Sequence, residues 1–513
     1  MKSLIDKQKQ TRQKNKNGRL YCCFVDFKKA FDTVPRAVLW QVLERLGIQG
    51  PILDCIKSMY AQDSAAVRSP AGISEIFECL MGVKQGCPLS ATLFGLYVDG
   101  LEQHLKDTVG HDAPSLSGIL IPLLLYADDL ILMSTSEAGL QKQLDALQQF
   151  CDQRQLSVNL TKTKIVTFGT WAQCRDFVFK GDVVERVKSY KYLGFEFHAT
   201  KGLAFGVSKL VSAANKALHS MRRTCAAMYI TDPAMQCQLF DTLVLPILSY
   251  ASGVWGVDEK AGAAAEQLHR QFLKRMLGLR DSIADVIVLA ECGRFPLQFH
   301  YWQQILRYHN RANKMSDTRL VRCAFLDDMQ HTSRTYWSHK VQHWLQKQDG
   351  SPSIQQDLNI KDIIDNAKAV YASSWHQVEL NSVARYHVLQ PEYEPAFHLS
   401  IVRSFKSRRL ISRFRCGCHG LHVDTGRLLP KLQQLPREQR HCHVCHNGVV
   451  EDEHHFLFDC PAYCSIRTRS NALFWGPAPS VSTFFALHDP RDVARFLREC
   501  FEHRNLCLST QGT

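Results

Sequence analysis

The sequence lacks a long apolar run and an obvious secretory signal. Its longest apolar stretch, residues 118–133, is interrupted by Asp128 and Asp129 and is shorter than the roughly 20 residues that a membrane-spanning helix needs. The opening segment, MKSLIDKQKQTRQKNKNGRL, has no apolar core of the kind that directs secretion. The sequence therefore predicts no membrane span and no membrane partner.

Acidic residues are scarce relative to basic ones. The 513 residues include 49 Asp+Glu against 62 Lys+Arg, a net charge of +13, which favours a polyanionic partner such as nucleic acid. The 19 cysteines are irregularly spaced, which predicts reduced thiols and one metal site rather than a disulfide framework. An apolar fraction of 45% excludes wholesale disorder, and the length suggests two to four domains.

Patterning divides the chain at about residue 200. Residues 1–19 carry seven basic side chains and one acid, which predicts a solvated flexible tail or an electrostatic arm on nucleic acid. Strands and helices then alternate up to residue 200, as in an α/β or α+β domain, and helices predominate afterwards. Expected strands cover 20–25, 118–125, 130–133, 165–168 and 191–198; expected helices run from Pro35 to Gly47, from a Ser134/Glu137 capping box, and over 209–228, 298–315 and 362–379, with a linker at 346–356.

Three carboxylates lie at the ends of apolar strands. Asp26 follows a buried run, and Asp128-Asp129 lie at the tip of an apolar hairpin. An acidic pair beside Leu, Ile and Met is costly unless a cation or hydrogen bonds compensate. Magnesium takes such hard oxygen ligands, and two such ions can support an in-line displacement at phosphorus. The alternative is that Asp-Asp is ordinary turn chemistry.

Five short motifs occur in a fixed order. They are FVDFKKAFD (24–32), GVKQGCPLS (82–90), YADD (126–129), NLTKTK (159–164) and YLG (192–194). In that order they resemble palm motifs A to E of reverse transcriptases, and their sequences are most similar to those of non-LTR (LINE-type) retrotransposons. The resemblance implies an α+β fold: a right-hand polymerase palm, with an antiparallel sheet and packed helices, followed by a mainly helical thumb and connection and a small zinc knuckle.

The resemblance also implies roles for individual residues. Asp26, Asp128 and Asp129 would hold two catalytic Mg²⁺, and Lys162, or less favourably Lys164, would protonate pyrophosphate unless it is a solvated turn lysine. Phe31 would be the steric gate against a ribose 2′-OH, or else a core residue. Gln85 and Gly86 would lie against nucleotide and template, or else form a plain turn. Tyr192, Leu193 and Gly194 would form the primer grip, or else a buried strand end.

The expected domains follow from the same likeness. They are a basic tail (1–19), the palm (20–200), a thumb-like helical region (201–300), a helical connection (301–435), a zinc-knuckle-like segment (436–470) and a C-terminal tail (471–513). Only 25 residues precede Asp26, which is too few for the fingers subdomain or an N-terminal endonuclease of such elements. The sequence is therefore expected to be a truncated gene model, a decayed copy or one part of a longer polyprotein.

Cysteine and histidine pairs near the C-terminus have zinc-ligand spacing. Cys442-x2-Cys445 is followed by His455-x4-Cys460, and two such pairs can close tetrahedrally on one structural Zn²⁺. The spacing resembles the CCHC knuckle of non-LTR polymerases. His454 is the alternative ligand to His455. The alternative to a zinc site is a small helical subdomain with reduced cysteines. Residues 416–419, CGCH, are too closely spaced for a complete site and are expected to be a plain loop.

A basic stretch precedes these cysteines. Residues 403–415 contain six basic side chains, no acid, Phe405 and Phe414, which suits phosphate contact and base stacking or, equally, a solvated helix face. The resemblance as a whole implies an RNA-directed DNA polymerase region that extends a primer 3′-OH with dNTPs, its partners being an RNA template and a DNA primer. The alternative function is a catalytically inactive remnant that binds nucleic acid.

Overall fold

The computed structural model describes residues 1–513 except 16–17, 110–111, 170–174, 332–335, 349–356, 378–380, 431–432, 475–479 and 511–513. The chain forms two compact units. The first unit comprises Met1–Val207 and Ala312–His339, and the second comprises Ser208–Arg311 and Lys340–Thr513. Most of the linker predicted at 346–356 lies outside the described residues.

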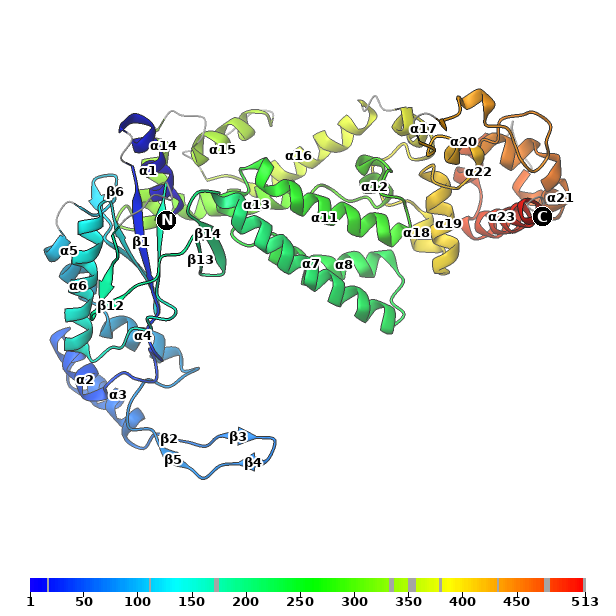
Figure 1. Ribbon diagram of the computed structural model, residues 1–513. Coiled ribbons are helices and arrows are strands. Elements are labelled where there is room, and N and C mark those ends of the chain that lie inside the picture. Colours follow the sequence, from blue (N-terminus) through cyan, green and yellow to red (C-terminus); the bar gives the residue numbers. More distant parts are fainter. Residues whose placement is uncertain are drawn as a thin grey trace. The chain divides into compact units, whose positions relative to one another are not determined.

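An antiparallel sheet of four strands forms the centre of the first unit (Figure 1). Its order is β10 (Lys164–Phe168), β1 (Leu20–Val25), β9 (Asp129–Ser134) and β8 (Leu123–Tyr126). All six residues of β1 are buried. Successive side chains of a strand point to opposite faces, so a continuous apolar run is what a strand covered on both faces requires.

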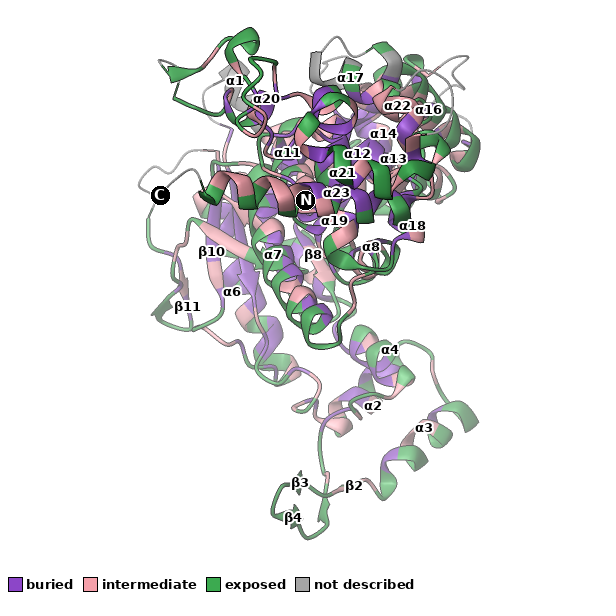
Figure 2. Cartoon of the chain, turned by 90° about the vertical axis from the view of Figure 1, so that its right-hand side faces the viewer, coloured by how far each residue is buried: buried purple, intermediate pink, exposed green. Residues whose placement is uncertain are grey.

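Each face of this sheet packs against its own core. One core contains Tyr21, Cys23 and Val25 with residues of α2 (Arg36–Arg45), α4 (Pro88–Tyr97), α5 (Leu101–Val109) and α6 (Glu137–Arg154). The other contains Leu20, Cys22 and Phe24 with residues of α1 (Lys2–Asn15) and of the hairpin β13 (Ser189–Tyr192)–β14 (Phe195–His198). Figure 2 shows the buried residues along α6 and β10.

The remaining elements of the first unit are short strands and two further helices. They are α3 (Pro51–Ala61), β2 (Ser64–Ala65), β3 (Arg68–Ser69), β4 (Gly72–Ile73), β5 (Phe77–Glu78), β6 (Ser115–Leu116), β7 (Ile119–Leu120), β11 (Val178–Phe179), β12 (Asp182–Val183) and α14 (Leu320–Met329). Strands β2 to β5 build a hairpin that is exposed along its length (Figure 2).

The second unit is helical in its described part. Its helices, three of which cross a boundary between the units, are α7 (Leu203–Ala227), α8 (Pro233–Leu243), α9 (Leu245–Leu248), α10 (Ser252–Trp255), α11 (Glu259–Leu277), α12 (Asp285–Glu291), α13 (Gln298–Asn313), α15 (Trp337–Gln346), α16 (Ile360–Ser374), α17 (Asn381–Leu389), α18 (His398–Ile401), α19 (Phe405–Arg415), α20 (His422–Thr425), α21 (Cys464–Arg469), α22 (Val481–Leu487) and α23 (Pro490–Thr510). The predicted α+β class is confirmed, and the helical second half matches the patterning after residue 200.

Two segments predicted as tails are instead helices. Helix α1 occupies most of residues 1–19 and buries Leu4 and Ile5 in the core behind the sheet, so two apolar residues anchor an otherwise polar segment. Residues 471–513 include α22 and α23, and α23 buries Phe496 and Leu497. Its apolar residues recur at helical spacing, the period that packs one helix face into a core.

Three expected elements have other boundaries in the structure. Helix α6 is capped by Ser136, whose Oγ accepts from the Gly139 amide at 2.9 Å, because β9 extends through Ser134. The strand expected at 191–198 is a hairpin, since Leu193 and Gly194 adopt positive φ and reverse the chain. Residues 118–125 are divided between β7 and β8. Pro122 separates the two strands because it has no backbone N–H to donate to a β-ladder.

Candidate active site and metal centre

The strand register brings the three candidate carboxylates to one end of the sheet. Val25 pairs with Leu130 in the antiparallel ladder between β1 and β9, so the next residue, Asp26, lies across from Asp129. Tyr126 pairs with Asp129 between β8 and β9, which leaves Ala127 and Asp128 as a two-residue turn. Ala127 has a φ of 54°, the left-handed backbone that such hairpin turns use.

The three carboxylates influence one another electrostatically. The pKa of Asp129 is raised, first by partial burial and then by the negative charges of Asp128 and Asp26. Burial together with Asp26 and Asp129 also raises the pKa of the nearby Tyr190 phenol. A concentration of negative charge of this kind is relieved by a cation, and carboxylate oxygens are the ligands that Mg²⁺ prefers. The residues present therefore fit the magnesium that the motifs imply.

The predicted lysine segment contacts Asp26 directly. The Asn159 amide donates to the Asp26 carbonyl at 2.7 Å, and the Asp26 amide donates to Thr163 Oγ1 at 3.2 Å. Lys162 Nζ then lies 3.7 Å from Asp26 Oδ2. Lys164 is occupied elsewhere, in an ion pair with Glu185 at 2.6 Å. Of the two lysines considered, Lys162 is the one beside the carboxylates.

The segment around Gln85 is joined to the chain that follows Asp26. The amides of Gly82 and Val83 donate to the carbonyls of Val34 and Phe31, at 2.8 and 2.7 Å. A Cβ at Gly82 would lie 2.6 Å from the Asp32 carbonyl oxygen, so glycine is required for this close approach.

Gln85 completes this link through its side chain. Its Nε2 donates to Asp32 Oδ1 at 2.8 Å, so the side chain is exposed but oriented. Gly86 adopts a φ of 81° with open space around it. The segment is therefore a turn, as the plain alternative proposed, and it is also fixed beside the strand that carries Asp26.

Phe31 combines features of both predicted roles. Its ring stacks on Phe94 with centroids 5.0 Å apart, which is core packing, yet the side chain is only partly buried. One ring face therefore supports α4 while another part stays accessible.

The hairpin that carries Tyr192, Leu193 and Gly194 packs on β1. Tyr190 stacks on Phe24 with ring centroids 4.4 Å apart. Burial, followed by the Asp129 charge, raises the pKa of Tyr192 to about 12. Tyr192 is buried and Leu193 begins the turn. The hairpin that carries the three residues therefore packs against β1, and Tyr192 is close enough to Asp129 for the charge of that carboxylate to act on it.

Sequence reasoning missed Arg36, which holds the loops of this site together. Its guanidinium donates to the Gly82 carbonyl at 3.0 Å, the Tyr60 carbonyl at 3.2 Å and Asp63 Oδ2 at 2.5 Å. No local signal marked Arg36, because Tyr60, Asp63 and Gly82 approach it only after folding.

The four predicted zinc ligands meet in the second unit. The ligand atoms of Cys442, Cys445, His455 and Cys460 lie within 4.8 Å of one another, and this is the one such cluster among the described residues. Zinc holds sulfur and nitrogen ligands at about 2.0–2.3 Å in a tetrahedron, so the donor set and the space fit Zn²⁺. A hydrogen bond with Cys460 lowers the pKa of the Cys442 thiol to about 4.

The structure distinguishes the two histidine candidates. His455 is buried, and its Nε2 lies 3.4 Å from Cys445 Sγ. His454 is exposed, and its Nδ1 lies 2.9 Å from Asp459 Oδ2. Because a π-helical turn begins at His455, the two neighbouring rings diverge. His455 is therefore the ligand candidate.

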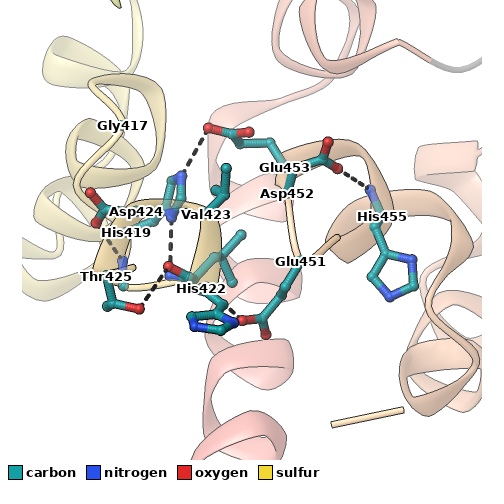
Figure 3. A network of polar contacts seen from close by, with 12 residues as sticks. Gly417, His419, His422, Val423, Asp424, Thr425, Glu451, Asp452, Glu453 and His455 are labelled. Atoms are coloured by element: carbon teal, nitrogen blue, oxygen red, sulfur yellow. Dashed lines mark hydrogen bonds and ion pairs between the residues drawn. The ribbon is translucent and has the colours of Figure 1, made fainter. Parts of the chain in front are cut away.

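Buried polar contacts hold the cluster's backbone (Figure 3). Asp452 Oδ1 accepts from the His455 amide at 3.0 Å. Glu451 is buried, accepts from the His422 amide at 2.6 Å, and pairs with Arg504 of α23 through contacts of 2.7 and 2.8 Å.

The basic stretch before the cluster is partly interior, so neither predicted role fits all of it. In α19, Arg408 and Arg415 are buried, and Arg415 Nε donates to Glu291 at 3.2 Å. Phe414 is also buried. The CGCH segment is a loop between α19 and α20, as predicted, and it is largely buried: His419 Nε2 lies 2.9 Å from Glu453 Oε1. No local signal marked these buried arginines, because Arg415 pairs with Glu291 and Arg408 donates to the Thr231 carbonyl, both distant in the sequence.

Comparisons with known proteins identify similar sequences. Residues 1–197 match the family described as reverse transcriptase (RNA-dependent DNA polymerase). The retrovirus-related Pol polyprotein from type-1 retrotransposable element R2 of Popillia japonica is 27% identical over 50% of this chain and 36% of its own length. The RNA-directed DNA polymerase from mobile element jockey of Drosophila melanogaster is 24% identical over 46% of this chain and 26% of its own.

The chain thus matches well under two thirds of the length of either relative. Among solved structures, apo telomerase from Candida tropicalis is 12% identical, with a TM-score of 0.30 over 63% of this chain and 55% of that chain. Within the described residues, every helix is too short or too polar to span a bilayer. Over residues 1–197 the chain thus matches the reverse transcriptase family, and it is similar to proteins of the non-LTR retrotransposons R2 and jockey.

Proposed function

We propose that the first unit is the palm of an RNA-directed DNA polymerase that extends a primer 3′-OH with dNTPs on an RNA template. The observation that carries this proposal is the placement of Asp26 across from Asp129, with Asp128 in the adjoining turn. The family match supports the substrate class, and the excess of basic residues suits a nucleic-acid partner.

The proposed mechanism uses side chains around these carboxylates. Asp26, Asp128 and Asp129 would hold two Mg²⁺, which when bound favour ionisation of the primer hydroxyl and neutralise the leaving pyrophosphate. Lys162, next to Asp26, would pass a proton to the pyrophosphate as it leaves.

Neighbouring residues would position the substrates. The accessible part of Phe31 would exclude a ribose 2′-OH, Gln85 and Gly86 would lie against nucleotide and template, and Tyr192, Leu193 and Gly194 would hold the primer end. In the second unit, the helices that follow Ser208 would serve as thumb and connection. The Cys442, Cys445, His455 and Cys460 cluster would hold one structural Zn²⁺.

Primer extension on poly(rA) with an oligo(dT) primer tests the proposal. We expect the wild type to incorporate dTTP only with Mg²⁺, and Asp128→Ala to lose incorporation by about a thousandfold or more, as expected when charge stabilisation in the transition state is lost. Asp182→Ala, an exposed carboxylate change on β12, is the matched control. Absence of incorporation by the wild type with retained RNA binding would support the inactive nucleic-acid-binding remnant instead.

A further inference from the structure

A pocket of about 750 Å³ lies within the second unit, apart from the metal cluster and the carboxylates. Residues of α12, α17, α19, α20 and α22 line it, together with the segment that leads to the cluster. His419, Val423, Asp424 and Glu453 belong to this lining, and Figure 3 shows His419 turned toward Glu453. The pocket is large enough for a ligand rather than for single waters.

The lining is strongly basic. It contains five arginines, namely Arg385, Arg415, Arg427, Arg437 and Arg440, against the two carboxylates of Asp424 and Glu453. Both carboxylates already have partners. Glu453 accepts from His419, and Asp424 pairs with Arg427 at 3.0 Å.

Three of the five arginines are structural, including Arg427 with its partner Asp424, and two are accessible. Arg415 is buried against Glu291, and Arg440 donates to the Leu435 and Val423 carbonyls. Arg385 and Arg437 are exposed on the rim, and the Arg437 side chain is 47% exposed in its ion pair with Asp452. Exposed ion pairs contribute little, so an incoming phosphate can compete for these guanidinium groups.

The pocket is apolar below this rim. Phe414 and Val423 are buried in the lining, while the Leu428 side chain is exposed. An apolar floor with a basic rim matches a nucleotide, whose base offers a flat π face for stacking and whose phosphate is anionic. An acidic peptide would match the rim but not the floor.

We propose that this pocket binds one unstacked nucleotide of single-stranded nucleic acid, with the phosphate at Arg385 and Arg437 and the base beside Leu428 and Phe414. Single strands can splay a base into such a pocket, whereas a duplex keeps its bases stacked. The choice of nucleic acid rests on the proposed function; the pocket and its charge do not.

Fluorescence anisotropy with a labelled oligo(U) RNA and the full chain tests this site. We expect the double change R385A/R437A to weaken binding by about tenfold and to lower the salt dependence by about two released ions. Leu428→Trp, which fills the pocket without changing charge, should also weaken binding. The matched controls are R495A/R498A, on α23, and Leu487→Trp, at the end of α22; they remove equal charge or add equal bulk outside the lining.

Crosslinking locates the contact independently of total affinity. A 4-thiouridine RNA should crosslink to peptides that contain Phe414 or Leu428, and Leu428→Trp should abolish these crosslinks. Two results would overturn the inference. In the first, both pocket variants bind RNA with wild-type affinity. In the second, poly-glutamate displaces the RNA while Leu428→Trp leaves RNA affinity unchanged. Failure of primer extension with pocket-dependent binding retained would reject the proposed polymerase activity but leave this site standing.

Discussion

The ammonium group of Lys162 lies 3.7 Å from Asp26 Oδ2, although Lys162 belongs to the turn before β10 and Asp26 follows β1. Pairing of β1 with β10 creates this proximity, and the hydrogen bonds from Asn159 and to Thr163 fix it. A cationic group is thereby held next to the carboxylates, where a leaving pyrophosphate would need a proton.

Replacing Lys162 should slow the chemical step. We expect Lys162→Ala to lower kcat by about 10²–10⁴-fold, the usual contribution of a positioned general acid, with little change in KM for dNTP. Lys164→Ala is the matched control because its ammonium pairs with Glu185 instead. Single-turnover incorporation measures the step, and equal rates for the two variants would contradict the assignment.

Magnesium should stabilise the first unit through Asp129. Its raised pKa means that the folded protein binds this proton more tightly than the unfolded chain, so stability from this group falls as pH rises through the raised pKa. A bound cation opposes that loss. We expect Mg²⁺ to raise Tm more at neutral than at acidic pH, and Asp128→Asn to reduce this effect in thermal melts. Asp182→Asn should respond like the wild type.

Phe31 should affect both selectivity and packing. We expect Phe31→Ala to increase rNTP incorporation relative to dNTP by about tenfold or more, since removal of an excluding group relaxes discrimination by at least 1.4 kcal/mol. Loss of the stacking on Phe94 should also destabilise the fold by about 3 kcal/mol or less, because Phe31 is only partly buried. Phe94→Leu, which weakens the stacking from the other side, separates the two effects. Unchanged sugar selectivity would leave only the packing role.

Sequence patterning identified the elements that carry the site because their signals are local. A continuous apolar run ending at Asp26 becomes β1, and the Tyr126–Asp129 segment becomes the tight hairpin between β8 and β9. The ladder that joins them is not local. Only the order of the five motifs indicated that Asp26 and Asp129 would meet, and the motif resemblance supplied the antiparallel sheet.

The sequence pattern could not predict which charged side chains are buried with partners inside the protein. Arg408 and Arg415 belong to a stretch whose composition suits water or phosphate, yet their partners, Thr231 and Glu291, are far away in the chain. Arg36 was overlooked for the same reason, since Asp63 and the Gly82 carbonyl approach it only after folding. Periodicity reports which face is apolar, not which charges find partners inside.

Zinc binding should depend on His455 and not on its neighbour. We expect His455→Ala and Cys442→Ser to lose stoichiometric zinc, because four ligands are needed to close the tetrahedron. His454→Ala and Cys464→Ser are matched controls, since both side chains are exposed outside the cluster. Metal analysis after dialysis gives the zinc content per chain. Zinc retained by His455→Ala but lost by His454→Ala would reverse the assignment.

The Glu451–Arg504 pair should couple the metal segment to α23. Glu451 is buried, and removing Arg504 alone leaves its carboxylate without its cationic partner. We expect Arg504→Met to destabilise the second unit by about 3–5 kcal/mol, the usual cost of breaking a buried pair, as measured by urea unfolding with zinc present. The double variant Glu451→Gln/Arg504→Met removes the uncompensated charge and should recover part of the lost stability.

The control is Arg498→Met, on the exposed face of α23, which should change stability by about 0.5 kcal/mol or less. Equal unfolding midpoints for Arg504→Met and Arg498→Met would show that the Glu451–Arg504 pair does not hold α23.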